Sequence, residues 1–176
     1  MEDIRLMHLY TGDGKGKTTA AMGLALRALG GGFRVLVAQF MKNGRSGELE
    51  ALRHFPNAFV IETPPMNKFS FNMNAEEKRE ARARQAEKLG EMRETILEIR
   101  PELMVFDELA IAVHLDMISE GDMWRLIETG LACGEVVVTG RYAPASLIAR
   151  ADYVSEIVKR AHPFDRGVKA RKGVEW

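Results

Sequence analysis

The sequence predicts an α/β fold in which a mostly parallel β-sheet is covered by helices on both faces. Short apolar runs rich in β-branched residues alternate along the chain with segments that show helical periodicity or capping signals. Most of these runs are apolar at nearly every position, which is typical of parallel strands buried on both sides. The first run leads through a glycine-rich turn directly into a helix.

Six strands share this apolar, β-branched or aromatic composition. They are expected at residues 4–10, 33–40, 58–62, 103–108, 135–141 and 153–158. Residues 41–50 are polar and contain glycines, and residues 63–73 contain two adjacent prolines, so both segments are expected to be irregular. Because ligands bind at the carboxyl ends of strands in open α/β sheets, residues 41–50 are expected to border a ligand site.

Four helices have recognisable ends. They are expected at residues 17–29, 74–100, 119–132 and 144–150. A run of three glycines stops the first helix. Asn74 and Glu77 have the spacing of a capping box, Pro101 ends the same helix, and its charged first half is interpreted as a solvated face. Ser119 is a suitable N-cap for the third helix, and Pro144 suits the first turn of the fourth.

The turn after the first strand alternates glycines with charged residues and ends in two threonines. Glycines allow close wrapping and positive φ angles, so that backbone N–H groups converge on phosphate oxygens at the start of a helix. Lys17 would neutralise phosphate charge, and Thr18 would offer its hydroxyl to Mg²⁺ or Mn²⁺. The sequence therefore predicts a nucleoside triphosphate site at Gly12, Asp13, Gly14, Lys15, Gly16, Lys17, Thr18 and Thr19.

One position departs from the usual phosphate-loop pattern. That pattern begins with a glycine five residues before the Gly16-Lys17 pair, and this chain has Thr11 there. We therefore expect the loop to enter its turn through Gly12 and Gly14. A glycine-rich turn that contains Gly-Lys-Thr by chance is the alternative, but the flanking strand and helix both favour a phosphate loop.

Acidic and basic residues follow two later strands. Asp107 and Glu108 end an apolar strand, at the place where phosphate-loop proteins hold Mg²⁺ directly or through water. They are predicted to form a metal site with Thr18, and a helix cap is the alternative. Arg141 follows another buried strand and is predicted to contact phosphate or substrate, with a surface ion pair as the alternative.

The composition excludes several classes of protein. A chain of 176 residues with 46% hydrophobic content fits one domain over residues 1–176. Lysine plus arginine equals aspartate plus glutamate at 25 each, so a nucleic-acid binder is not expected. No signal peptide or membrane-spanning run is apparent, so we expect a soluble, cytoplasmic protein. The single cysteine, Cys133, excludes an internal disulfide and is interpreted as a small buried residue without chemistry.

These groups predict nucleotide binding but leave the reaction open. Hydrolysis, phosphoryl transfer and switching all use the same phosphate and metal groups. The sequence offers no Ser/His/Asp or Cys/His arrangement and no clear general base.

Several segments, in this order along the chain, resemble those of the ATP:corrinoid adenosyltransferases of the phosphate-loop type. They are TGDGKGKTTAA (11–21), VAQFMKNG (37–44), FSF (69–71), VFDEL (105–109), VTGR (138–141) and HPFDRGVKARKGVEW (162–176). The resemblance runs from near the first strand to the last residue. It implies a P-loop NTPase-like, RecA-like three-layer fold and a role in adenosylcobalamin synthesis or salvage.

The resemblance implies that Co(I) of a reduced corrinoid attacks the 5′ carbon of ATP and that inorganic triphosphate leaves. Co(I) is itself a strong nucleophile, so the protein needs no activating base. Lys15, Lys17 and Thr18 would stabilise the leaving triphosphate together with the loop amides and Mg²⁺. Glu108 matches the metal-associated acid of the family, and Arg141 would lie near the phosphates.

Two aromatic residues then gain a role. In this family, the residues that match Phe69 and Phe71 are thought to close over the lower face of the corrin and to displace its axial ligand. Loss of a donor ligand raises the reduction potential of Co(II), so that a reduced flavoprotein can supply the electron. Related chains often have Trp and Gly where this chain has Phe71 and Lys68. Two core phenylalanines under a loop are the alternative.

The resemblance also implies ATP as co-substrate, with cobalamin, cobinamide or cobyrinic acid a,c-diamide as the corrinoid, and a homodimer. We expect the tail, about residues 159–176, to fold over the ligand edge or a partner subunit. Two other functions remain open. A small-molecule kinase or ATPase would release ADP, and a non-catalytic ATP-gated corrinoid carrier would bind both ligands without turnover.

Overall fold

The computed structural model describes residues 4–41, 46–64 and 73–175, and within them the six predicted strands form one sheet. The strands are β1 (Met7–Thr11), β2 (Val35–Gln39), β3 (Ala58–Ile61), β4 (Leu103–Asp107), β5 (Glu135–Thr139) and β6 (Tyr153–Glu156). Their order is β3-β2-β4-β5-β1-β6, and every neighbouring pair is parallel. The α/β prediction is therefore confirmed.

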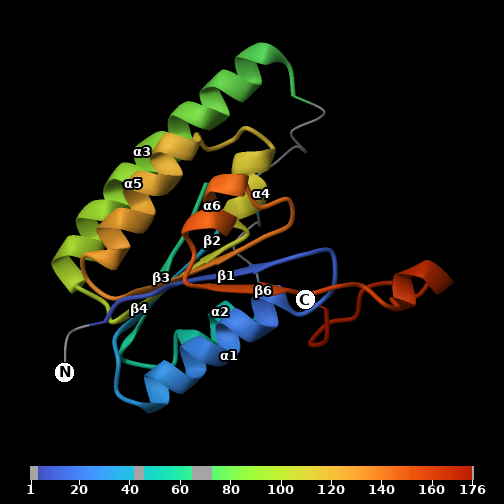
Figure 1. Cartoon of the computed structure of the whole chain (residues 1–176), viewed down its shortest axis with the longest axis horizontal. Helices are drawn as coiled ribbons and strands as arrows, with labels where there is room; N and C mark the ends of the chain where they lie inside the picture. Colours follow the sequence, from blue (N-terminus) through green and yellow to red (C-terminus); the bar gives the residue numbers. More distant parts are fainter. Residues whose placement is uncertain (1–3, 42–45, 65–72, 176) are drawn as a thin grey trace.

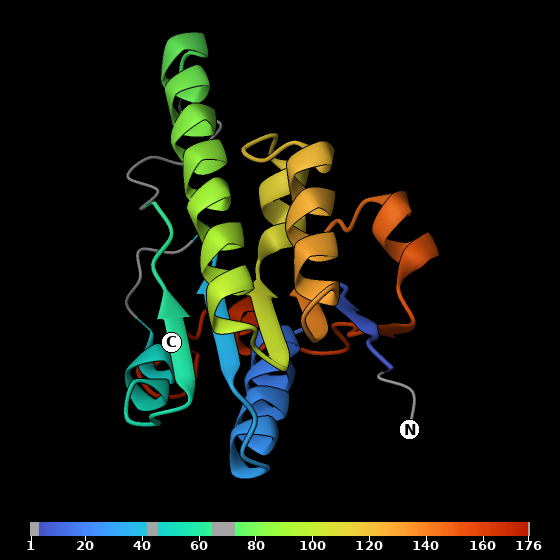
Figure 2. The ribbon, with the colours of Figure 1, turned by 90° about the vertical axis from the view of Figure 1, so that its left-hand side faces the viewer.

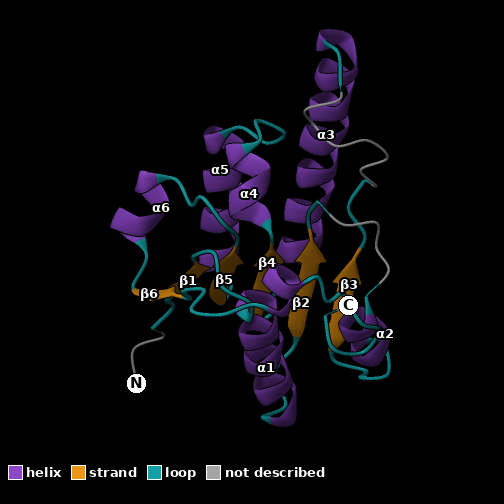
Figure 3. Cartoon of the chain, turned by 90° about the vertical axis from the view of Figure 1, so that its right-hand side faces the viewer, coloured by secondary structure: helices purple, strands orange, loops and turns teal. Residues whose placement is uncertain are grey.

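Helices cover both faces of this sheet. They are α1 (Lys17–Gly30), α2 (Gly47–Leu52), α3 (Ala75–Ile99), α4 (Leu109–His114), α5 (Glu120–Leu131) and α6 (Ala145–Arg150), and the tail contains a 3₁₀ helix at Pro163–Arg166. Helices α1 and α2 lie on one face, and α3 to α6 lie on the other (Figure 1, Figure 3). This is a three-layer P-loop NTPase-like arrangement. In the described part of the chain, no helix combines the length and apolarity needed to cross a membrane.

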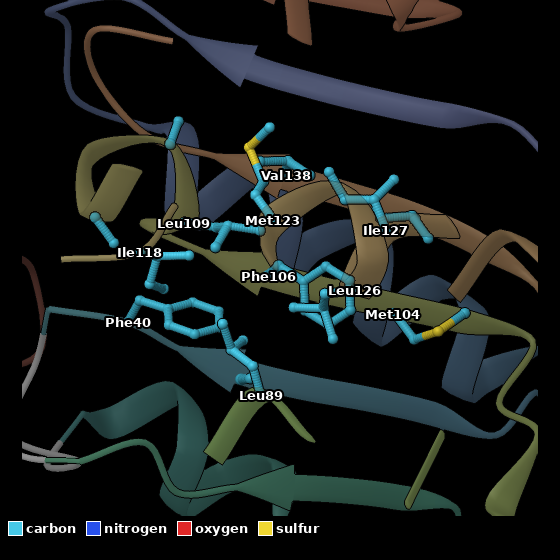
Figure 4. Close-up of a cluster of buried hydrophobic side chains, with 14 of the residues drawn as sticks. Phe40, Leu89, Met104, Phe106, Leu109, Ile118, Met123, Leu126, Ile127 and Val138 are labelled. Atoms are coloured by element: carbon cyan, nitrogen blue, oxygen red, sulfur yellow. The ribbon is translucent and has the colours of Figure 1, made fainter. Parts of the chain in front are cut away.

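Two hydrophobic clusters explain why the strands are apolar at nearly every position. In β4, Met104 and Phe106 belong to the cluster under α3 and α5, whereas Leu103 and Val105 belong to the cluster under α1. Figure 4 shows the first cluster, in which Phe106 packs among side chains from α3, α4 and α5. Because both faces of a central strand are buried, alternation of polar and apolar residues is absent.

The predicted helix ends are largely confirmed. At the start of α3 (Figure 2), the Glu77 N–H donates to Asn74 Oδ1 and the Asn74 N–H donates to Glu77 Oε2, each at 2.9 Å. At the start of α5, the Asp122 N–H donates to Ser119 Oγ at 3.0 Å. Pro144 is the N-cap residue of α6, one position before the first turn in which it was expected.

Two local expectations were wrong, for residues 41–50 and for Cys133, and two features, α4 and the exposure of β6, were not predicted. Helix α2 lies partly inside residues 41–50, which were expected to be a loop. Ser46 caps this helix, and its Leu49 and Leu52 are buried. A helix of six residues is too short for helical periodicity to be recognised in the sequence. Helix α4 was not predicted either, for the same reason. Strand β6 is exposed at all four positions because it is an edge strand with little cover. Cys133 is only partly buried, at the turn between α5 and β5.

Gly134 provides a test of the packing between the turn that follows α5 and the residues that directly precede β4. A Cβ at this position would lie 2.4 Å from the Glu102 carbonyl oxygen, so Gly134→Ala forces the backbone apart. We expect Gly134→Ala to lower the free energy of unfolding by about 1–3 kcal/mol, the usual cost of overpacking. Urea unfolding followed by circular dichroism measures it.

Gly23→Ala is the matched control. Gly23 is exposed in α1, and its added Cβ would meet nothing within 4 Å. This substitution should raise the free energy of unfolding by about 0.5–1 kcal/mol, because alanine is the better helix former. A Gly134→Ala protein as stable as the wild type would show that the close approach at this turn is not a constraint.

Candidate active site

The loop between β1 and α1 folds around the side chain of Lys17, and two of its glycines adopt positive φ angles. These are Gly12 at +97° and Gly16 at +126°. Gly14 does not, so the expectation that all three glycines supply positive φ angles was wrong. A Cβ on Gly14 would lie 2.8 Å from the Ile157 carbonyl oxygen, and the Gly14 N–H donates to that oxygen at 2.7 Å. Gly14 is therefore required for close contact with the chain that follows β6.

Thr11 explains how the loop works without its customary first glycine. This residue still belongs to β1 and is buried, and its Oγ1 donates to the Gly140 carbonyl oxygen at 2.9 Å. The Thr11 carbonyl oxygen accepts from the Ile157 N–H at 2.9 Å. The turn consequently begins at Gly12, as the sequence predicted.

Lys17 is the first residue of α1 and is 6% exposed. Its Nζ donates to the Gly12 carbonyl oxygen at 2.8 Å and to the Gly14 carbonyl oxygen at 2.7 Å. Burial, reinforced by the charge of Arg141, lowers the pKa of Lys17. A partly desolvated ammonium group gains more from an incoming phosphate than one in water would, because the surrounding dielectric is lower.

Asp107 is fully buried at the end of β4 and gathers donors from three neighbouring elements. Its Oδ1 accepts from Thr18 Oγ1 and Thr139 Oγ1, both at 2.7 Å, and its Oδ2 accepts from Gln39 Nε2 at 3.0 Å. The structure thus brings the predicted Thr18 and Asp107 together. Gln39 and Thr139 were missed, although a signal existed: each is a polar last residue that directly follows at least three apolar residues of its strand.

Glu108 has a left-handed backbone conformation, with φ 61° and ψ 19°, at the N-cap of α4. This conformation costs roughly 1–2 kcal/mol for a residue other than glycine. The Glu108 N–H donates to Thr139 Oγ1 at 2.9 Å, which helps to hold the turn. Backbone strain of this kind is concentrated at functional sites.

These groups surround a cavity of about 360 Å³ at the carboxyl edge of the sheet. Its lining comprises Gly14, Lys15, Gly16, Lys17, Thr18, Thr19, Glu48, Glu108, Arg141, His162, Ala170, Val174 and Glu175. Most predicted site residues therefore meet in one place. Gly12 does not line the cavity, and neither does Asp107, which is fully buried behind Thr18. Asp13 does not line it either, and its Oδ1 accepts from the Lys159 N–H at 3.0 Å. Phe69 and Phe71 lie outside the described residues.

The tail contributes a carboxylate to this cavity. Arg171 donates to Glu175 through its backbone N–H at 2.8 Å and through its guanidinium at 2.9 and 3.1 Å. This pairing lowers the pKa of Glu175 to about 2, with a smaller contribution from the charge of Lys15. The sequence analysis expected residues 41–50 to border the ligand site and the tail to fold over the ligand edge or a partner subunit, but it named neither Glu48 nor Glu175 as a site residue.

Comparison with known proteins places this chain in a family. The family model described as ATP:corrinoid adenosyltransferase BtuR/CobO/CobP matches residues 3–176. The chain belongs to this family. The resemblance of its motifs is thereby confirmed, and the family is one of enzymes.

Relatives over nearly the full chain agree with this assignment. A corrinoid adenosyltransferase of Pseudomonas aeruginosa is 34% identical, over 96% of this chain and 82% of the relative. A corrinoid adenosyltransferase of Escherichia coli K12 is 31% identical, over 96% of this chain and 84% of the relative. The corrinoid adenosyltransferase CobA of Salmonella typhimurium LT2 is 31% identical, over 99% of this chain and 87% of the relative.

The strain at Glu108 can be measured by comparing two substitutions that both remove the carboxylate. In an ordinary helical position alanine is more stable than glycine, but a left-handed position reverses the order. We expect Glu108→Gly to be more stable than Glu108→Ala by about 1 kcal/mol. Denaturant unfolding of both variants gives this difference directly, and a more stable alanine variant would contradict the left-handed turn.

Proposed function

We propose that the protein transfers the 5′-deoxyadenosyl group of ATP to Co(I) of a reduced corrinoid and releases inorganic triphosphate. The supporting observation is a phosphate-loop cavity in a chain that matches the adenosyltransferase family over residues 3–176. The reaction would serve adenosylcobalamin synthesis or salvage. The relatives in Pseudomonas aeruginosa, Escherichia coli and Salmonella typhimurium are named for corrinoid adenosyl transfer.

The proposed step moves electron pairs but no proton. The Co(I) electron pair forms a bond to the 5′ carbon of ATP, the C5′–O bond breaks, and triphosphate leaves with the electrons of that bond. Cobalt becomes formally Co(III). Because the nucleophile belongs to the substrate, the protein has to hold ATP, neutralise the leaving group and exclude water.

The cavity has the charges for this task. Lys15, Lys17 and Arg141 line it and would offset the charge that develops on the leaving triphosphate. The backbone amides at the start of α1 would bind phosphate oxygens at the positive end of the helix dipole. We propose that the tail closes over this triphosphate, because Ala170, Val174 and Glu175 lie along the same cavity.

The residues at the loop fit Mg²⁺ or Mn²⁺. Within the described residues there is no group of three or more His, Cys, Asp or Glu side chains that could hold a metal. Mg²⁺ does not need one, since it keeps several waters and uses one or two protein oxygens together with substrate phosphates. Thr18 Oγ1 and the Glu108 carboxylate would hold it, and Asp107 would act through Thr18 or through water. When bound, the ion would neutralise phosphate charge.

The corrinoid side of the site is proposed from the family. Phe69 and Phe71 would cover the lower face of the corrin and displace its axial ligand, so that a reduced flavoprotein can reduce Co(II). Cobalamin, cobinamide or cobyrinic acid a,c-diamide would be the substrate, and the protein would act in the cytoplasm.

A homodimer is supported by the exposed edge strand β6, which presents Tyr153 and Val154 to solvent.

The activity is tested by mixing the protein with ATP, Mg²⁺ and chemically reduced corrinoid. We expect the corrin spectrum to change to that of a light-sensitive alkyl-cobalt product, without ADP. Lys17→Ala should slow this change by about 100-fold or more, since it removes a principal charge partner of the leaving group. Accumulation of ADP with an unchanged spectrum would favour a kinase or ATPase, and binding without turnover would favour a carrier.

Phe71→Ala separates the two steps that the proposal assigns to the corrinoid side. The variant should react at about the wild-type rate with Co(I) reduced in advance, because the transfer step needs no axial displacement. Starting from Co(II) and a reduced flavoprotein, it should be slower by about tenfold or more, since the retained axial ligand lowers the reduction potential. Equal losses in both assays would refute displacement of the axial ligand.

A further inference from the structure

A line of polar side chains continues from Asp107 away from the cavity, and the proposed function does not use it. It runs through Gln39, the last residue of β2, to Ser46, the N-cap of α2. Gln39 is 3% exposed and Ser46 is 9% exposed, in surroundings that are otherwise apolar on this face of the sheet. Buried polar side chains are costly unless each of them is paired.

Gln39 is placed beside Asp107 by the sheet itself. The two residues are register partners in the parallel ladder between β2 and β4, and the two strands lie next to each other (Figure 3). The Gln39 Nε2 donates to Asp107 Oδ2 at 3.0 Å, and Ser46 Oγ donates to Gln39 Oε1 at 2.9 Å. The second oxygen of the same carboxylate, Oδ1, accepts from Thr18 Oγ1.

The Asp107 carboxylate fixes which way the Gln39 amide points. A carboxylate oxygen only accepts, so the amide must turn its NH₂ group toward Asp107 and its Oε1 toward Ser46. The Ser46 hydroxyl suits this orientation: its oxygen accepts the Leu49 N–H as the cap of α2, at 3.4 Å, and its own proton is donated to Gln39 Oε1. The start of α2 thereby supports the orientation in which Gln39 donates to Asp107.

We propose that Gln39 is a positioning residue for the metal and triphosphate site. By holding Asp107 Oδ2, it keeps the carboxylate in the one orientation in which Oδ1 accepts the Thr18 proton. The lone pairs of Thr18 Oγ1 are then left facing the cavity, where a divalent cation would bind. This inference rests on the proposed function for the identity of the nucleotide, but its own claim concerns metal-dependent binding.

The same connection links the site to α2. Glu48 lies in the first turn of α2 and lines the cavity, and Ser46 caps that turn. Gln39 therefore joins the carboxylate at the end of β4 to the element that presents Glu48. Loss of its side chain would disturb both at once.

Gln39→Met is the test, because methionine has a similar shape but lacks the amide that donates to Asp107 and accepts from Ser46. We expect ATP affinity measured by calorimetry with Mg²⁺ present to fall about 10-fold or more, the usual loss when a residue behind a metal ligand is changed. Affinity measured with EDTA should be unchanged. Mn²⁺ binding in the presence of ATP, followed by electron paramagnetic resonance, should weaken in parallel.

Two further variants keep the inference falsifiable. Gln85→Met is the matched control: Gln85 is also 3% exposed, but it belongs to α3 on the other face of the sheet, so Mg²⁺ dependence should be unchanged. Ser46→Ala keeps the Gln39 side chain but removes the hydroxyl that donates to its Oε1. It should give a smaller loss of Mg²⁺-dependent ATP affinity than Gln39→Met. An unaltered Mg²⁺ dependence in Gln39→Met, or an equal loss in Gln85→Met, would overturn the inference.

The outcome is separable from that of the proposed function. If the wild type transfers no adenosyl group but Gln39→Met still loses Mg²⁺-dependent ATP binding, the proposed reaction fails and the positioning role stands. If the wild type transfers the group and Gln39→Met keeps wild-type Mg²⁺ dependence, the positioning role fails alone.

Discussion

The buried carboxylate of Asp107 is the constraint on which the rest of the site depends. An ionised group that is fully buried is costly unless donors surround it, and here they come from the phosphate loop, β2 and β5. Satisfying one carboxylate therefore fixes the start of α1 against the ends of three strands. The next residue, Glu108, is the N-cap of α4, where its backbone has a left-handed conformation, and it lines the cavity.

The phosphate loop is held from its other side by the chain that follows β6. The Ile157 carbonyl oxygen accepts from the Gly14 N–H, and the Lys159 N–H donates to Asp13. These contacts explain two features of the loop sequence that phosphate binding alone does not: a glycine without a positive φ angle at position 14, and an acidic residue that turns away from the cavity. The same segment then leads into the tail that carries Glu175 back to the loop.

The sequence predicted those features that depend on residues close together along the chain. The strand positions, the capping box of Asn74 and Glu77, and the helix that begins at Lys17 all follow from local patterns and are confirmed. Thr18 and Asp107 were predicted to meet because a known motif relates them. Gln39 was not found, since its place beside Asp107 arises from strand register. Glu48 and Glu175 were not named, although the segments that contain them were expected near the ligand edge, because sequence alone does not show which side chains of a segment face a site. Helix α2 was missed because its signal is two buried leucines in a short polar segment.

The arrangement fits the proposed reaction, in which the protein supplies no nucleophile. Cationic groups at the loop would meet the group that departs, and the attacking electrons would come from the corrinoid. A single turnover with ATP labelled at the 5′ carbon and at the γ-phosphate tests this account most directly. It predicts that the carbon label is found on cobalt and that the phosphate label is found in inorganic triphosphate, in equal amounts. Phosphate label in orthophosphate or in a phosphorylated acceptor, with the carbon label left in ADP, would contradict it.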